Sequence, residues 1–396
     1  MTLKKYTLGL LAIVFALLTL TALFNRVVDP FWYFRDIEIN GFNVDKPHFS
    51  RNERLVKGPL LKKLQPDAII MGSSYAEVGL PPTHAGFSES GQLRTYNLAL
   101  SGAGWPEVYC YAMYAMDQAP LKRLVLGLSA AAGDATCSSY GDLSQPDYVK
   151  LLFSKNALDA SFVTLRRQND GKPRITREGL WYFNRFNEKI RTDDDIANNF
   201  AYEISGQFCT SPGERSREID YARINKLARF SEQESRGLRA IIRTALRKNI
   251  RLVLFTYPKH VLSYEVERMC DRLVARWNHL RQIVALVDEE TRTKPGLVEV
   301  WDFYGYREAN AERVHAGKNM SDRLWQDSGH FNHEVGSILF DKIFSGVGDY
   351  GVKVTSENFD SLIPAAEYQR RNFLRQRPWI DDELIEVARL AGAKMR

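Results

Sequence analysis

The chain has 396 residues, of which 44% are hydrophobic and 26% are charged, a balance typical of folded globular proteins and not of disordered chains. Its formal net charge is +6, and the 54 basic and 48 acidic residues are spread along the whole length, which argues against a nucleic-acid-binding arm. A mildly basic surface beside an anionic membrane is enough to explain this charge.

The first element is an uncharged apolar run from Leu8 to Phe24, preceded by Lys4 and Lys5. Its length is close to the roughly 20 residues that span a bilayer. A cleaved signal peptide is the alternative, but the run exceeds a usual signal core and no Ala-x-Ala site follows, so we expect an uncleaved anchor. The two lysines predict that the N-terminus lies inside, and the aromatic residues 31–34 are expected to form a belt at the outer interface. In a bacterium this describes a single-pass inner-membrane protein whose main domain lies in the periplasm.

The composition changes along the chain and suggests four regions. We expect residues 1–28 to form a cytoplasmic tip and transmembrane anchor, and residues 29–64 a polar juxtamembrane stalk. Residues 65–346 are expected to form the main domain, with an insertion at about 136–218 that caps the strand ends. The charged tail, residues 347–396, is expected to be helical, and its basic run at 370–377 is interpreted as a solvated helix face, with anionic lipid or polysaccharide as an alternative contact.

Short apolar segments alternate with amphipathic helical stretches through the main domain. The predicted strands are Ala68–Met71, Gln92–Leu100, Leu121–Leu128, Ile250–Tyr257 and Val298–Phe303, and the predicted helices are Trp105–Asp117, Ser231–Lys248 and Tyr264–Thr291. Apolar runs bounded by Gly, Ser and Pro are typical of strands buried on both faces, and their alternation with helices indicates βαβ units. The predicted fold class is therefore α/β, a three-layer sandwich with a central parallel sheet.

The four cysteines show no Cys-x-x-Cys spacing, which argues against a zinc site or a thioredoxin-type motif. Cys137 and Cys209 lie in loop-like segments and are the candidates for a disulfide in an oxidising compartment. Cys110 and Cys270 lie in helical patterns, where a cysteine is expected to act as a small buried hydrophobe.

Two polar clusters suggest a chemical site. Gly72-Ser73-Ser74 follows the first predicted strand, where open α/β sheets place their binding crevices. Asp327 and His330 lie three residues apart in a turn before a late helix, so the carboxylate can orient the imidazole as a base for a serine hydroxyl. The simpler alternatives are an ordinary turn at the serines, a helix cap at Asp327 and a surface role for His330.

A metal site at His330 with its neighbours His333 and Glu334 lacks the His-Glu-x-x-His spacing. We therefore expect neither a metal nor a cofactor.

These motifs, together with Asn97-Leu-Ala-Leu-Ser-Gly102 after the second predicted strand, resemble the SGNH hydrolase superfamily, whose domain is flavodoxin-like. The resemblance implies that Ser74 is the nucleophile, His330 the general base and acid, and Asp327 the residue that orients the histidine. It also implies an oxyanion hole made by the backbone N–H of Ser74 with that of Gly102 or Gly104.

The third-block asparagine of that superfamily has no counterpart here, because Ser129-Ala-Ala-Ala-Gly-Asp134 follows the third predicted strand. Either the oxyanion hole has two donors, with Ser129 assisting, or activity has been lost.

With its membrane anchor, the chain resembles most the membrane-anchored alginate O-acetylation proteins and D-alanyl transfer proteins of the superfamily. The function expected from this resemblance is transfer of an acyl group, acetyl above all, through an acyl-serine to an extracytoplasmic polysaccharide, with an acyl-delivering membrane protein as partner. The alternatives are a carbohydrate esterase, and a non-catalytic scaffold or glycan-binding subunit of an exopolysaccharide complex.

Overall fold

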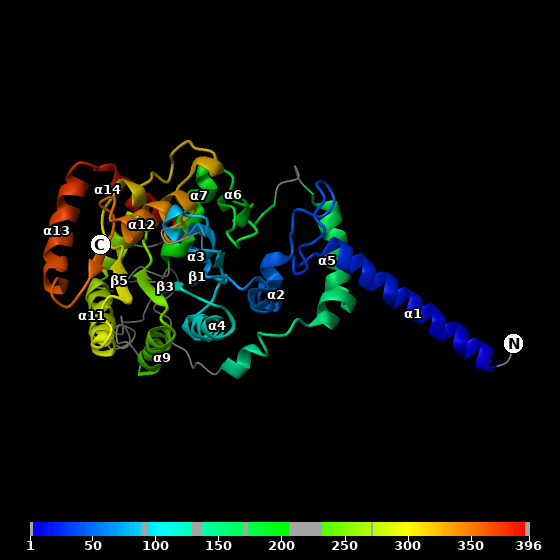
Figure 1. Ribbon diagram of the computed structural model, residues 1–396. Coiled ribbons are helices and arrows are strands. Elements are labelled where there is room, and N and C mark those ends of the chain that lie inside the picture. Colours follow the sequence, from blue (N-terminus) through cyan, green and yellow to red (C-terminus); the bar gives the residue numbers. More distant parts are fainter. Residues whose placement is uncertain are drawn as a thin grey trace, which may run out of the picture. The chain divides into compact units, whose positions relative to one another are not determined.

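The computed structural model describes residues 3–88, 93–128, 137–168, 173–205, 232–270 and 272–392. The chain divides into two compact units (Figure 1). The first comprises residues 1–65 and 141–176, and the second comprises residues 66–140 and 177–396. The segment expected as one insertion is thus shared between the units.

The first unit is built around a long apolar helix, α1 (Leu3–Val28), which is long and apolar enough to cross a membrane. Its other elements are α2 (Phe49–Leu64), a π-helical turn (Val149–Phe153) and α5 (Lys155–Arg166). The last turn of α1 packs into this unit, because the buried Asn25 donates to the carbonyl of Leu152 (2.8 Å) and accepts from Ser161 Oγ (2.8 Å). Beyond Asn25, Val28 of α1 is buried and Val27 is 36% exposed.

The predicted aromatic belt at residues 31–34 is wrong. Phe31, Trp32 and Tyr33 are 1%, 4% and 8% exposed, so their rings belong to the core of the first unit. The buried carboxylate of Asp29 turns the chain back on itself, because it accepts hydrogen bonds from the backbone N–H groups of Tyr33, Phe34 and Arg35, each at 2.9 Å.

The second unit contains a six-stranded sheet in the order β2-β1-β3-β4-β5-β6. Its strands are β1 (Ala68–Met71), β2 (Thr95–Asn97), β3 (Arg123–Leu128), β4 (Arg251–Thr256), β5 (Val298–Asp302) and β6 (Val352–Val354). The first five are parallel, and β6 pairs antiparallel with β5. Every residue of β1 and β3 is buried, as expected of strands that are covered on both faces.

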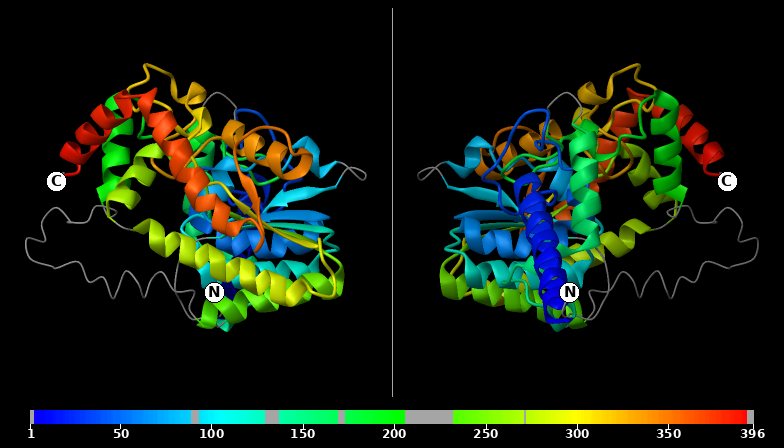
Figure 2. Two further views of the ribbon diagram at one scale, coloured as in Figure 1. Left: turned by 90° about the vertical axis from the view of Figure 1, so that its left-hand side faces the viewer. Right: turned by 90° about the vertical axis from the view of Figure 1, so that its right-hand side faces the viewer.

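Helices cover both faces of the sheet (Figure 2), so the predicted α/β fold class is confirmed. One face carries α4 (Trp105–Gln118), α9 (Glu232–Lys248) and α11 (Arg272–Thr291), and the other carries α3 (Ser74–Gly79) and α12 (His333–Ser345). The remaining helices are α6 (Phe183–Phe186), α7 (Asp193–Ser205), α10 (Val261–Met269), α13 (Phe359–Arg375) and α14 (Trp379–Leu390), with short 3-10 turns at Ala85–Phe87, Cys137–Tyr140, Glu308–Asn310 and Met320–Asp322.

The strand order reverses at β1, since the chain first moves outward to β2 and then crosses back to β3. Ligands of open α/β sheets bind at such a switch point, beyond the carboxyl ends of the strands. The fold therefore places the residues that directly follow β1 at the position most suited to a site.

Two features of the second unit differ from the sequence prediction. The stretch Tyr264–Thr291 is not one helix, because α10 ends at Met269 and α11 begins at Arg272. The edge strand β6 lies in the tail that was expected to be helical. Only three residues long and partly exposed, β6 lacks the apolar run by which the buried strands were recognised.

The disulfide also differs from the prediction. Cys137 pairs with Cys110 of α4, with a Cα–Cα distance of 5.4 Å, and not with Cys209, which lies outside the described residues. Cys110 is buried as expected, but it is oxidised, and none of the described cysteines is free. Because disulfides persist in oxidising compartments, this bond and the apolar helix α1 together indicate an extracytoplasmic domain.

Candidate active site

The turn after β1 presents Ser74 at the switch point of the sheet. Met71 ends β1, Ser73 adopts an extended conformation as the N-cap residue of α3, and Ser74 is the first helical residue. The hydroxyl of Tyr257, which follows β4, accepts the N–H of Ser73 at 3.1 Å. This hydroxyl fills the space beside Gly72, where a Cβ would overlap it, so only glycine fits at that position. The bulk and the hydrogen bond of Tyr257 together fix the path of the chain into Ser74.

A second turn carries Asp327 and His330. An isolated antiparallel bridge joins Trp325 to Phe331, and the N–H of Gln326 donates to the carbonyl of His330 at 3.0 Å, so the five residues between form a closed loop. Inside it, Oδ1 of Asp327 accepts the backbone N–H of Gly329 (2.8 Å) and of His330 (2.7 Å). These local bonds hold Oδ2 toward the imidazole.

The two turns meet although they lie 256 residues apart. His330 Nδ1 lies 2.6 Å from Asp327 Oδ2, and His330 Nε2 lies 2.9 Å from Ser74 Oγ. A carboxylate only accepts hydrogen bonds, so Nδ1 carries the proton and Nε2 is left as the acceptor of the Ser74 hydroxyl proton. The structure thus brings together the three side chains that the sequence nominated as a triad, in the hydrogen-bonded order that nucleophilic catalysis requires.

The electrostatics of the pair suit this arrangement. Burial alone would raise the pKa of Asp327, but the charge of His330 and the hydrogen bonds that the carboxylate accepts lower it overall. Burial alone would lower the pKa of His330, but Asp327 raises it overall, with smaller contributions from Glu203 and Glu77. Asp327, which is 3% exposed, is therefore ionised, and its negative charge favours the protonated form of the His330 imidazole.

Helix α7 supplies two polar groups that the sequence did not indicate. Asn199 Nδ2 donates to the carbonyl of Gln326 (3.0 Å) and to Asp327 Oδ2 (3.3 Å). Glu203 follows four residues later on the same face of the helix, and its charge reaches both Asp327 and His330. Burial raises the pKa of Glu203, and the negative charge of Asp327 adds to that rise. The spacing of four residues between Asn199 and Glu203 was the only signal in the sequence.

Close packing holds the two turns against each other. At Gly79 of α3 a Cβ would overlap the ring of Phe331, and at Gly336 of α12 it would overlap the carbonyl of Gly79. Two aromatic rings lie beside the imidazole of His330, that of Tyr75 at 4.6 Å and that of Phe186 at 5.2 Å between centroids. The side chain of His330 is nevertheless 14% exposed, and Ser74 is half-buried, so solvent reaches both groups.

The backbone N–H of Ser74 with that of Gly102 or Gly104 was predicted to form an oxyanion hole. Within the described ranges, the N–H groups of Ser74, Gly102 and Gly104 donate no hydrogen bond, so they are available to an incoming oxygen. Gly102 occupies a left-handed turn (φ +67°), and Gly104 is the N-cap residue of α4. Their convergence on an oxyanion stays a prediction. The segment 129–134, which includes the candidate Ser129, lies outside the described residues.

Asn97 has a structural role in the second block of the motif. Its amide donates to the carbonyls of Ala76 (2.8 Å) and Leu80 (3.1 Å), and its carbonyl accepts the N–H of Ala99 (3.1 Å). These bonds tie the end of β2 to the helix that begins with Ser74.

No group of three or more His, Cys, Asp or Glu side chains suited to a metal ion occurs among the described residues. Comparison of the chain with known protein families and with curated proteins finds no match.

Proposed function

We propose that the protein is a membrane-anchored, extracytoplasmic serine O-acyltransferase of the SGNH type, acting on a polysaccharide. The observation that carries this proposal is the continuous series of hydrogen bonds from Ser74 Oγ through His330 to the buried carboxylate of Asp327. A serine whose hydroxyl points at an oriented, carboxylate-backed imidazole is the arrangement that activates a weak nucleophile.

The first half-reaction forms an acyl-serine. As Ser74 Oγ attacks the carbonyl carbon of the acyl donor, its proton passes to His330 Nε2, and Asp327 stabilises the imidazolium. The carbonyl oxygen becomes an oxyanion, to which the free N–H groups of Ser74 and of Gly102 or Gly104 would donate. Collapse of this intermediate breaks the bond to the leaving group, which takes the proton from His330 and departs.

The second half-reaction is the reverse sequence with a new partner. His330 Nε2 removes a proton from a hydroxyl of the acceptor glycan, and the resulting alkoxide attacks the acyl carbon. The second tetrahedral intermediate collapses with release of Ser74 Oγ, which regains its proton from His330. The acyl group then resides on the glycan as an ester, and the enzyme is restored.

The membrane location and the source of the acyl group are also part of what we propose. We place α1 in the inner membrane and the chain that follows it in the periplasm, and we propose that a membrane protein delivers the acyl group, acetyl above all. The two lysines that precede the apolar run support this orientation.

Replacement of the triad in cells tests the proposal. Strains that carry Ser74→Ala or His330→Ala should lose the ester groups of their cell-surface or secreted polysaccharide, as measured by release of acetate on mild alkaline treatment. Ser73→Ala is the matched control, because it keeps the N–H that Tyr257 binds, and it should retain ester content. Unchanged ester content in the Ser74 and His330 strains would contradict the proposal.

A carbohydrate esterase differs only in using water as the acceptor. In the purified protein, formation of glycan ester from an activated acetyl ester supports transfer, whereas exclusive release of acetate in the presence of glycan would identify an esterase.

A further inference from the structure

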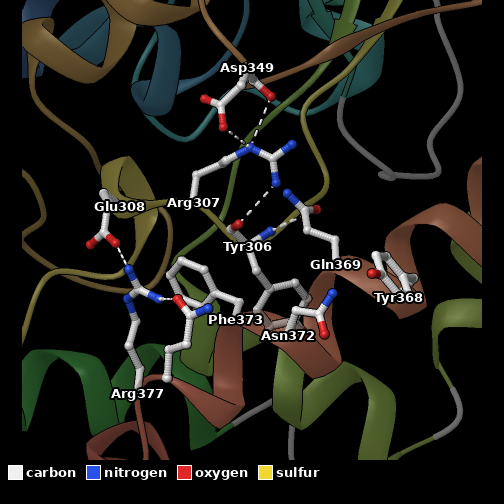
Figure 3. Close-up of a pocket in the computed structure, with 10 residues that line it drawn as sticks. Tyr306, Arg307, Glu308, Asp349, Tyr368, Gln369, Asn372, Phe373 and Arg377 are labelled. Atoms are coloured by element: carbon white, nitrogen blue, oxygen red, sulfur yellow. Dashed lines mark hydrogen bonds and ion pairs between the residues drawn. The ribbon is translucent and has the colours of Figure 1, made fainter.

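A polar groove with an aromatic floor lies in the second unit and shares no residue with the Ser74 site (Figure 3). The segment 306–308 after β5, Asp349 and the C-terminal half of α13 form its walls, and its volume is about 420 Å³. This volume falls within the range of about 300–1,000 Å³ that is usual for small-molecule sites. We infer that this groove is a subsite for an uncharged, hydroxyl-rich glycan, which holds the acceptor polysaccharide while Ser74 transfers the acyl group.

Aromatic rings line the floor and the rim of the groove. Tyr306 is buried, and its hydroxyl donates to Glu265 Oε1 at 2.6 Å, so its ring is held in place. The ring of Phe373 lies 6.2 Å from that of Tyr306, and Tyr368 is 65% exposed at the rim. The aromatic face open to a ligand is that of Tyr368, because Tyr306 is 1% exposed and the guanidinium of Arg377 covers one face of the Phe373 ring. An aromatic face of this kind packs against the C–H face of a sugar ring at small cost in side-chain entropy.

The charged side chains of the groove are already paired. Arg307 binds Asp349 (2.9 Å), and Arg377 binds Glu308 while its guanidinium lies 3.9 Å from the centre of the Phe373 ring. The guanidinium groups are largely covered, whereas the carboxylates of Glu308 and Asp349 are 74% and 83% exposed. Since each positive charge is compensated, the groove is not built to capture an anion.

The uncharged polar side chains complete the lining. Asn372 lies on α13 beside Phe373, and its amide offers both a donor and an acceptor. Gln376 is the C-cap residue of α13, and its amide oxygen accepts from Arg377 (3.4 Å) while its NH2 group can donate. Together with the exposed carboxylates they match the mixed donors and acceptors of sugar hydroxyls. A lipid or an apolar peptide would leave these groups unpaired, which is costly.

The groove and the triad are joined by the same helix, α10. At its beginning, His260 donates its backbone N–H to the carbonyl of Ser328, inside the loop that carries Asp327 and His330. Five residues later, Glu265 accepts from Tyr306 in the floor of the groove. At 1.5 Å per residue this separation along the helix is about 7.5 Å. Helix α10 thus connects the loop that bears His330 with the floor of the groove through hydrogen bonds at two of its positions.

The inference rests on the proposed function, but its first test does not require turnover. Binding of cellohexaose and chitohexaose, two uncharged probes, is measured by calorimetry on the full chain in lipid nanodiscs, with a galacturonate hexamer as the charged comparator. At least one uncharged hexamer should bind saturably, and Tyr368→Ala with Asn372→Ala should weaken it about tenfold, equivalent to about 1.4 kcal/mol. Tyr368→Phe keeps the ring and should bind like the parent protein, as should Arg371→Ala, an exposed residue of α13 outside the groove.

The outcomes separate this inference from the proposed function. Ser74→Ala should bind the probe normally, and the groove variant should hydrolyse p-nitrophenyl acetate, a small acyl ester, at the parent rate. The inference is overturned if neither cellohexaose nor chitohexaose binds saturably, or if the charged hexamer binds more tightly than both. It is also overturned if the groove variant binds the uncharged hexamer as tightly as the parent protein does. If the parent protein binds glycan but neither hydrolyses nor transfers an acyl ester, the proposed function is overturned instead.

Discussion

Replacement of Asp327 by asparagine changes one atom in the centre of the site, and the structure dictates how the new side chain must lie. Oδ1 of Asp327 accepts two backbone N–H groups, those of Gly329 and His330. In Asp327→Asn the amide oxygen must stay on that side, because an NH2 group there would face two donors. The NH2 group then faces His330 Nδ1 and the amide of Asn199. Nδ1 is forced to accept, the ring proton moves to Nε2, and Nε2 no longer accepts the proton of Ser74.

The size of the effect follows from this wrong tautomer. We expect kcat to fall by about 10⁴-fold, the loss typical of a triad whose histidine is held in that form. This corresponds to about 5.5 kcal/mol of transition-state stabilisation. The assay is hydrolysis of p-nitrophenyl acetate by the full chain, with circular dichroism to show that the fold is intact. Asn199→Ala removes one longer bond to the same carboxylate and should cost much less. A loss below tenfold in Asp327→Asn would refute the reasoning.

Three further predictions concern packing, cross-linking and pH dependence. Gly72→Ala should destabilise the fold by about 1–3 kcal/mol, since the new methyl group overlaps the hydroxyl of Tyr257, and Tyr257→Phe in the same chain should recover part of this loss in urea unfolding. Cys110→Ser opens a disulfide that spans 27 residues and should lower the free energy of unfolding by about 3.5 kcal/mol, with a lower melting temperature as the readout. His330 must be neutral to act as a base, so activity falls as the pH drops through its raised pKa. Glu203→Gln removes a negative charge that raises this pKa, and the acid limb of the pH–rate profile should move to lower pH; no movement, or an upward one, would contradict the assignment.

The sheet was largely predictable because its strands are buried on both faces. Ala68–Met71 is a continuous apolar run with every residue buried, and such a run has few other interpretations. The edge strand β6 has only one of its three residues buried, so its sequence has no apolar run that would identify a buried strand. The break between α10 and α11 was missed because apolar residues continue at helical spacing across it.

The candidate triad was predictable because Ser74, Asp327 and His330 lie in short polar turns. The residue types in these turns and their spacing are those that a serine nucleophile and its base require. Asn199 was not, since a single amide on a helix has no distinguishing pattern in the sequence. Its role depends on where α7 lies, which is a tertiary property. The same holds for Tyr257, which reaches the turn after β1 from the end of β4, 184 residues from the Ser73 N–H that it binds.

Two predictions failed because the sequence pattern did not reveal which side chain holds each segment in place. The Cys137 pairing depends on the approach of α4, which loop-like sequence does not reveal. The aromatic residues 31–34 follow an apolar helix as an interfacial belt would, but the carboxylate of Asp29 folds them into the protein.

The most direct test of the central claim is to trap the acyl-enzyme. The full chain is mixed with p-nitrophenyl acetate, quenched in acid, digested and mapped by mass spectrometry. We expect one acetyl group on Ser74, formed in the parent protein and in Ser73→Ala and missing in Ser74→Ala. An acetyl group on another residue, or turnover that continues in Ser74→Ala, would contradict this expectation.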